Sequence, residues 1–126
     1  MNYKIVKETK PTLKNYGRYK AVAVHHQTID TAQVCQEIQD NCSLKKSDVV
    51  AVLSELSEVI TRHLQNGDRV RLKNLGLLKL EIESDKVDTP EAFDIRKHIR
   101  NFRIHFLPES QKGRQELYEN IELNKT

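Results

Sequence analysis

Hydrophobic and polar positions recur along this chain with two different periods, and the change of period separates helices from strands. Between residues 30 and 65, apolar side chains return every three or four positions, which is typical of amphipathic helices. On both sides of that stretch they alternate with other residues at every second position, as they do in strands. The pattern predicts an α+β fold in which two strands precede two helices, followed by a ribbon and a returning strand.

The first predicted helix begins near Asp30 or Thr31, either of which can cap the free amides of its opening turn. The second begins at Ser47 as the capping residue and stops at Asn66-Gly67, where glycine is free to adopt a left-handed conformation. The apolar positions of the second helix are Val49, Val52, Leu53, Leu56, Val59, Ile60 and Leu64. That stripe is wider than one short helix covers, which favours a second chain as its partner.

From Asp68 onward the period is two, which predicts a two-stranded ribbon that reverses at residues 74–76. Residues 95–106 return as a further strand, with Phe102, Ile104 and Phe106 on one face. A last short helix is predicted for residues 110–120. At the other end of the chain, residues 3–9 and 18–25 are predicted to be strands joined by a turn over residues 11–17.

Charge is distributed unevenly along the 126 residues, whose formal net charge is +3. Residues 1–27 contain six basic side chains and one acidic one, a net charge of +5, whereas the other 99 residues contain 15 basic and 17 acidic ones, a net charge of −2. This asymmetry favours a polyanionic partner over a neutral ligand. We therefore divide the chain into a basic β extension (1–27) and a second domain (28–126).

Several classes of protein find no support in the sequence. The longest apolar run spans only residues 21–24, far too short to cross a membrane, and the N-terminus lacks the apolar core of a secretory signal. No glycine-rich phosphate loop or nucleophile elbow is present, so we expect no enzyme, cofactor or small-molecule substrate. Cys35 and Cys42 are seven residues apart and the adjacent His25 and His26 point opposite ways on a strand, so we expect no metal site. Two unpaired thiols suit a reducing cytoplasm.

Three segments in this order carry a resemblance to a known family. They are Leu44-Lys45-Lys46-Ser47-Asp48 before the second helix, Asn66-Gly67-Asp68-Arg69-Val70-Arg71-Leu72-Lys73-Asn74-Leu75-Gly76 after it, and Phe106-Leu107-Pro108 near the end. Together they resemble the bacterial histone-like HU and integration host factor family over residues 30–121. The resemblance implies an HU-like fold: two helices below a saddle of strands, an arm, and a short C-terminal helix. It also implies an intertwined homodimer that binds double-stranded DNA in the nucleoid.

The segment in the place of the family's DNA-embracing arm departs from the family pattern. Residues 81–101 contain six acidic side chains against four basic ones, and Pro90 lies between Thr89 and Glu91 rather than in a basic tip. One interpretation is a helix start, with Thr89 as the cap and Phe93 folding back onto the sheet. The other is the family's proline wedge, which enters between base pairs. Leu107 is a second departure, because the family has a lysine there.

The candidate DNA-binding residues lie on three segments. They are Arg96, Lys97, Arg100 and Arg103 at the base of the arm, Arg69, Arg71 and Lys73 on the ribbon, and Arg18 and Lys20 in the extension. The ribbon cations could equally be a solvated strand face. Two functions therefore stay open: a dimeric DNA-binding protein of low sequence specificity, or an HU-fold interaction module that has lost tight DNA binding.

Overall fold

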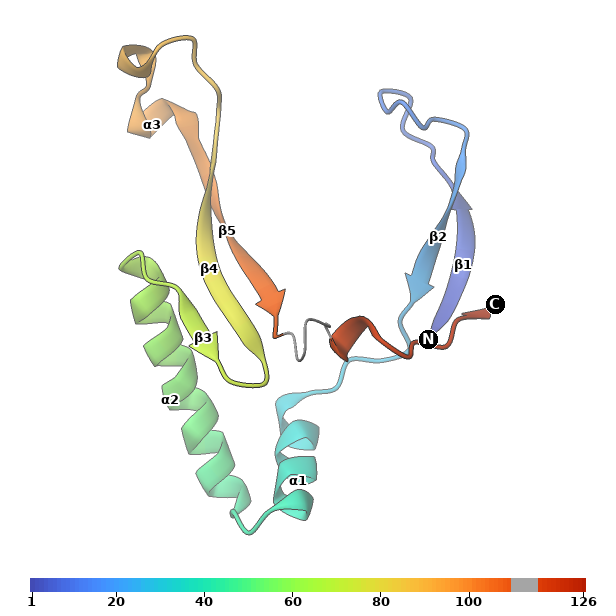
Figure 1. The fold of residues 1–126 in the computed structure, drawn as a ribbon, viewed down its shortest axis with the longest axis vertical. Helices are drawn as coiled ribbons and strands as arrows, with labels where there is room; N and C mark the ends of the chain where they lie inside the picture. The colour runs from blue at the N-terminus through green and yellow to red at the C-terminus, as the bar shows by residue number, and fades with distance from the viewer. Residues whose placement is uncertain (110–115) are drawn as a thin grey trace.

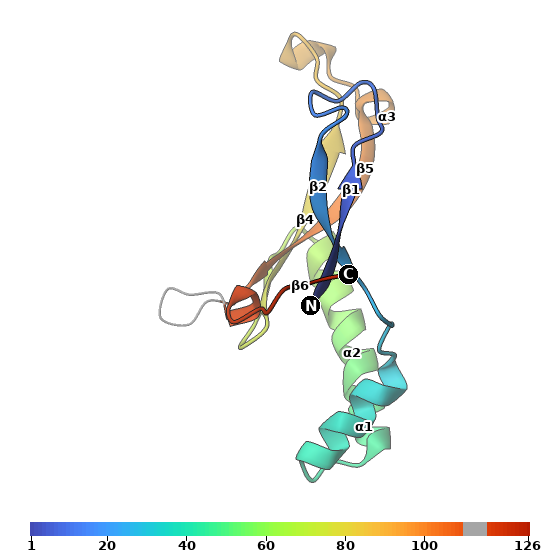
Figure 2. The same ribbon diagram turned by 90° about the vertical axis from the view of Figure 1, so that its right-hand side faces the viewer.

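The computed structural model describes residues 1–109 and 116–126 and has the α+β composition expected from the sequence. Two hairpins project in the same direction, and the two long helices lie at the opposite end (Figures 1 and 2). The elements are β1 (Asn2–Lys7), β2 (Tyr19–Val24), α1 (Thr31–Asn41), α2 (Lys46–Gln65), β3 (Val70–Leu72), β4 (Gly76–Ser84), the 3-10 turn η1 (Pro90–Ala92), α3 (Ile95–His98), β5 (Ile99–Pro108), the 3-10 turn η2 (Glu116–Tyr118) and β6 (Asn124–Lys125).

The N-terminal hairpin belongs to a three-stranded sheet in the order β2-β1-β6. β1 and β2 pair antiparallel, and β6 adds a parallel strand to the other edge of β1, with Asn2 opposite Asn124. The sequence pattern predicted the hairpin but not this third strand. Residues of the C-terminal segment thus complete the sheet of the N-terminal extension.

The helices begin and end close to the predicted positions, with one correction. Asp30 caps α1, because its carboxylate accepts a hydrogen bond of 2.9 Å from the backbone N–H of Gln33. The prediction that Ser47 caps α2 is wrong: the capping position is Lys45, two residues earlier, and its side chain makes no capping hydrogen bond. Asp48 lies in the first turn, where its charge suits the helix dipole.

The second sheet has the order β3-β4-β5, and all its neighbours are antiparallel. Its register places Leu78, Leu80 and Ile82 of β4 opposite Phe106, Ile104 and Phe102 of β5, so that one face of the ribbon is apolar. The predicted strand over residues 95–106 is wrong at its start. Residues 95–98 form α3 instead, because the Asp94 carboxylate accepts a hydrogen bond from the N–H of Arg96 and caps a short helical turn.

The arm ends in a compact tip rather than an extended one. η1 begins after Thr89 with Pro90 at its first position, as the helix-start interpretation expected, although the Thr89 side chain makes no capping hydrogen bond. Phe93 packs against the ring of His98 on α3, with ring centroids 5.5 Å apart. The predicted last helix falls partly on residues 110–115, outside the described residues, and its described part is the turn η2.

A single chain leaves most of its apolar side chains in contact with solvent. Its accessible surface is 11188 Å² for 14.7 kDa, whereas a compact monomer of that mass exposes about 6,900 Å². Among the described residues, the buried apolar side chains are Cys35, Val49 and Leu64 alone. Val52 on α2 and Ile82, Phe102 and Ile104 on the ribbon are each more than half exposed. The chain therefore has too little core of its own for its size.

Candidate nucleic-acid interface

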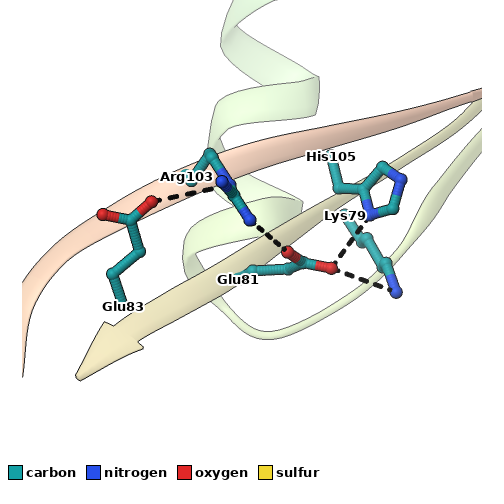
Figure 3. A network of polar contacts seen from close by, with 5 residues as sticks. All are labelled: Lys79, Glu81, Glu83, Arg103 and His105. Atoms are coloured by element: carbon teal, nitrogen blue, oxygen red, sulfur yellow. Dashed lines mark hydrogen bonds and ion pairs between the residues drawn. The ribbon is translucent and has the colours of Figure 1, made fainter. Parts of the chain in front are cut away.

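The polar face of the ribbon carries a network of paired charges. The register of β4 and β5 puts Glu81 opposite Arg103 and Lys79 opposite His105, all on the face away from the apolar row. One Glu81 oxygen lies 2.9 Å from His105 Nδ1 and 3.4 Å from Lys79 Nζ, and its other oxygen lies 3.5 Å from Arg103 Nη2 (Figure 3). Arg103 also faces Glu83, with 3.6 Å between Nε and Oε1.

This surrounding set of donors stabilises the charged form of Glu81. Its pKa is lowered to about 2, first by the hydrogen bond with His105 and then by those with Lys79 and Arg103. Glu81 is therefore a carboxylate at all physiological pH values, and the positive charge of its neighbours is largely balanced. A phosphate group approaching this face meets glutamates as well as cations.

Other predicted DNA-binding cations also have acidic partners. Arg100 Nε forms an ion pair with Asp85, and Arg71 Nη1 lies 3.9 Å from Glu109 Oε1. In the extension, Lys20 Nζ lies 3.2 Å from Glu8 Oε2. The sequence pattern could not reveal these pairs, because most of them join residues that only the strand register brings together.

The remaining predicted cations have no acidic partner within the part of the chain that the structure describes. They are Arg18, Arg69, Lys73, Arg96 and Lys97, and all five are exposed. Such side chains can neutralise phosphates without first giving up an ion pair.

The structure gathers the predicted cations into separate groups. Arg69 and Arg71 line one shallow hollow beside the His63–Asp68 pair, and Arg96 and Lys97 project from α3 at the arm tip. Arg18 and Lys20 line a third hollow, in the N-terminal hairpin, together with Lys14, which the sequence pattern did not single out. Six of the nine predicted residues thus line three separate hollows in a single chain.

Two further findings concern membranes and metal ions. No helix among the described residues is long and apolar enough to span a bilayer. Within the same residues, no three side chains of the His, Cys, Asp and Glu types come together as a metal site would require.

Comparison with known proteins gives a consistent result. The HU-HIG family model, described as an HU domain fused to wHTH, Ig, or glycine-rich motif, matches residues 1–125. A solved structure described as a "Putative bacterial DNA binding protein", from Bacteroides vulgatus, has a similar fold with a TM-score of 0.63 at 13% sequence identity. The similarity covers 98% of this chain and 47% of that one, so the chain spans about half the length of that protein. No curated protein matches the sequence.

Proposed function

This chain belongs to the HU-HIG family, and from that premise we propose that it binds double-stranded DNA as a homodimer with little sequence specificity. The observation that carries the proposal is the match of an HU-domain family over residues 1–125, and the name given to the similar solved structure agrees with it. On this proposal the protein is non-enzymatic, needs no cofactor and works at the nucleoid in the cytoplasm.

The homodimer is supported by the exposed apolar surface. The stripe of α2 and the apolar face of β4 and β5 leave Val52, Ile82, Phe102 and Ile104 in water in a single chain. The excess over a compact monomer is about 4,000 Å² for each chain, whereas obligate dimers bury about 1,000–2,500 Å² per partner, so a large dimer interface would account for much of the excess. A second copy covering these faces supplies the core that one chain lacks.

Low sequence specificity follows from the kind of side chains available. The cations without acidic partners are suited to phosphate contacts, which position a protein on the duplex and carry no sequence information. Arg69, Arg96 and Lys97 are the residues of the HU-like domain that we assign to this role, and Lys73 extends the ribbon group. Any preference among DNA molecules would come from duplex shape and deformability.

The network around Glu81 favours a second candidate function. Because Arg103, Lys79 and His105 are already balanced by glutamates, the ribbon face attracts phosphates less than a basic face would. The arm is also net acidic. These features fit an HU-fold protein-interaction or scaffold module that keeps the dimer fold and has lost tight DNA binding.

Binding to a short random duplex across a salt series distinguishes the two functions. The variant Arg96→Gln/Lys97→Gln removes two unpaired cations, and Lys45→Gln/Lys46→Gln removes the same charge at the N-terminus of α2. We expect the logarithm of wild-type affinity to fall linearly with the logarithm of salt concentration. The first variant should flatten that slope by about 0.9 for each phosphate that it no longer neutralises, and the second should leave it unchanged. A dimer of proven mass that shows no binding at low salt would support the interaction module.

A further inference from the structure

We propose that the turn of the N-terminal hairpin is a DNA-binding arm in its own right, with Lys14, Arg18 and Lys20 forming its phosphate site. The inference rests on the proposed DNA binding and adds that a main DNA contact lies on the basic hairpin and not on the acidic arm. The three cations lie around one hollow between the turn and β2, which Glu8, Leu13, Asn15 and Tyr19 complete.

The turn holds these cations on an ordered backbone. The N–H of Glu8 donates to the carbonyl of Arg18 at 2.8 Å, and the N–H of Gly17 donates to the carbonyl of Glu8 at 3.0 Å. Within the loop, Tyr16 and Arg18 donate to Leu13 and Asn15, each at 3.0 Å. Gly17 has a φ of 81°, which glycine adopts without strain. A loop fixed in this way loses little conformational entropy when it binds a ligand.

Glu8 is the one acidic residue of the extension, and its carboxylate already has partners within the hairpin. The hollow therefore keeps a net positive charge. The Glu8 carboxylate accepts a hydrogen bond from the backbone N–H of Lys10 at 3.2 Å and pairs with Lys20 Nζ at the same distance. These contacts, with the Lys10 amide as the largest cause, lower the pKa of Glu8. Lys14 and Arg18 have no acidic partner in the part of the chain that the structure describes, so both charges face solvent unbalanced.

The two projecting hairpins differ in charge and surface chemistry. The arm between β4 and β5 is net acidic and closes on itself through η1 and α3, whereas the N-terminal extension has a net charge of +5. Both point the same way (Figures 1 and 2), so DNA approaching that end meets the basic hairpin. Tyr16 and Tyr19 are 59% and 69% exposed beside the cations, and tyrosine hydroxyls are common phosphate donors in DNA complexes.

The test uses the whole chain and two matched variants. Lys14→Gln/Arg18→Gln removes the two unbalanced charges of the hollow, and Lys45→Gln/Lys46→Gln removes two exposed charges at the far end of the molecule. With a short random duplex, we expect the hairpin variant to flatten the log–log salt slope by about 1.8 per hairpin, and by about 3.6 if both hairpins of a dimer bind. The control should keep the wild-type slope.

A third variant separates loss of charge from loss of loop structure. Lys14→Arg/Arg18→Lys keeps both charges and should keep the wild-type slope, while circular dichroism and thermal unfolding verify that each variant is folded. Wild-type binding with an unchanged slope in Lys14→Gln/Arg18→Gln would overturn the hairpin site and leave the proposed function standing. Absence of duplex binding by the wild type would overturn both.

Discussion

Gly76 shows at the level of one residue why the ribbon turns where it does. Its φ of 152° is in the region that favours glycine, and a Cβ added there would lie 2.3 Å from the carbonyl oxygen of Leu107. A neighbouring backbone atom cannot move aside as a flexible side chain can. The turn between β3 and β4 therefore depends on the missing side chain as well as on backbone freedom.

We predict that Gly76→Ala destabilises the protein more than Gly67→Ala does. A Cβ at Gly67 meets nothing within 4 Å, so that variant experiences only the cost of a positive φ, about 1–2 kcal/mol. Gly76→Ala adds a clash that must displace β5, which should bring the total to about 3 kcal/mol or more. Urea unfolding of both variants measures the difference in their free energies of unfolding. Equal losses of that free energy would show that the close approach of the Leu107 carbonyl to Gly76 adds no cost.

The lowered pKa of Glu81 predicts how the free energy of unfolding changes with pH. Because its pKa is about 2 in the folded protein and 4.5 in its ordinary state, its contribution is fully present above pH 4.5 and is lost as the pH falls toward 2. The free energy of unfolding should therefore decline over that window in the wild type. In Glu81→Gln the decline should be shallower, as measured by denaturant unfolding at a series of pH values. Identical pH profiles would show that the network contributes no stability.

At the scale of elements, the ribbon has two faces with different tasks. The apolar face of β4 and β5 is exposed in the single chain, and the polar face is a ladder of balanced charges (Figure 3). The strand register creates both, since a shift by one residue would exchange them. Altering the acids of the ladder therefore tests the electrostatics of the face while the apolar side stays intact.

We predict that Glu81→Gln/Glu83→Gln strengthens DNA binding. The substitutions release Arg103 from both of its partners and remove two charges that repel phosphates. Affinity at low salt should rise about tenfold or more, and the salt slope should become steeper. Lys79→Gln, which removes a cation from the same network, should act in the opposite direction. A double variant that binds no better than wild type would place the DNA away from this face.

The elements differ in how far the sequence predicted them. The hairpin, α1, α2 and the ribbon follow from periodicity, and the start of α1 follows from its Asp30 cap; both signals act within a few residues. α3 was missed because the Asp94 cap outweighs the strand pattern around Ile95, and β6 was missed because two residues carry no periodicity. Similarly, the cations of the candidate site could be named from the sequence, but the partners of Arg103 and Arg100 are set by strand register and the path of the arm.

At the scale of the whole molecule, the open shape and small core leave a single chain with little apolar burial to stabilise its fold. Burial of apolar surface is the main favourable contribution to folding, and one chain leaves its widest apolar faces in water. The dimer is therefore part of the proposed fold as well as of the proposed function.

We predict that Val52→Glu disrupts the dimer and that Ala51→Glu does not. Both residues are exposed in a single chain, but Val52 lies on the apolar stripe of α2 and Ala51 on the opposite side of the helix. An unpaired charge buried in an interface costs about 3 kcal/mol or more, which corresponds to about a hundredfold weaker association. Sedimentation equilibrium at several concentrations gives the mass of each variant. A Val52→Glu protein that remains dimeric would exclude this face from the interface.

The pairing of β1 with β6 has a consequence for the order of events during synthesis. Asn2 lies opposite Asn124, so the third strand of the N-terminal sheet is translated 122 residues after the first. At cellular translation rates of about 5–20 residues per second, β1 and β2 wait roughly 6–24 s for β6. During that interval one edge of β1 has unpaired backbone groups, which is the condition under which nascent strands pair with the wrong neighbour. Within the 126 residues, β1 is thus the first strand to be synthesised, and its sheet is completed only when β6 has been made.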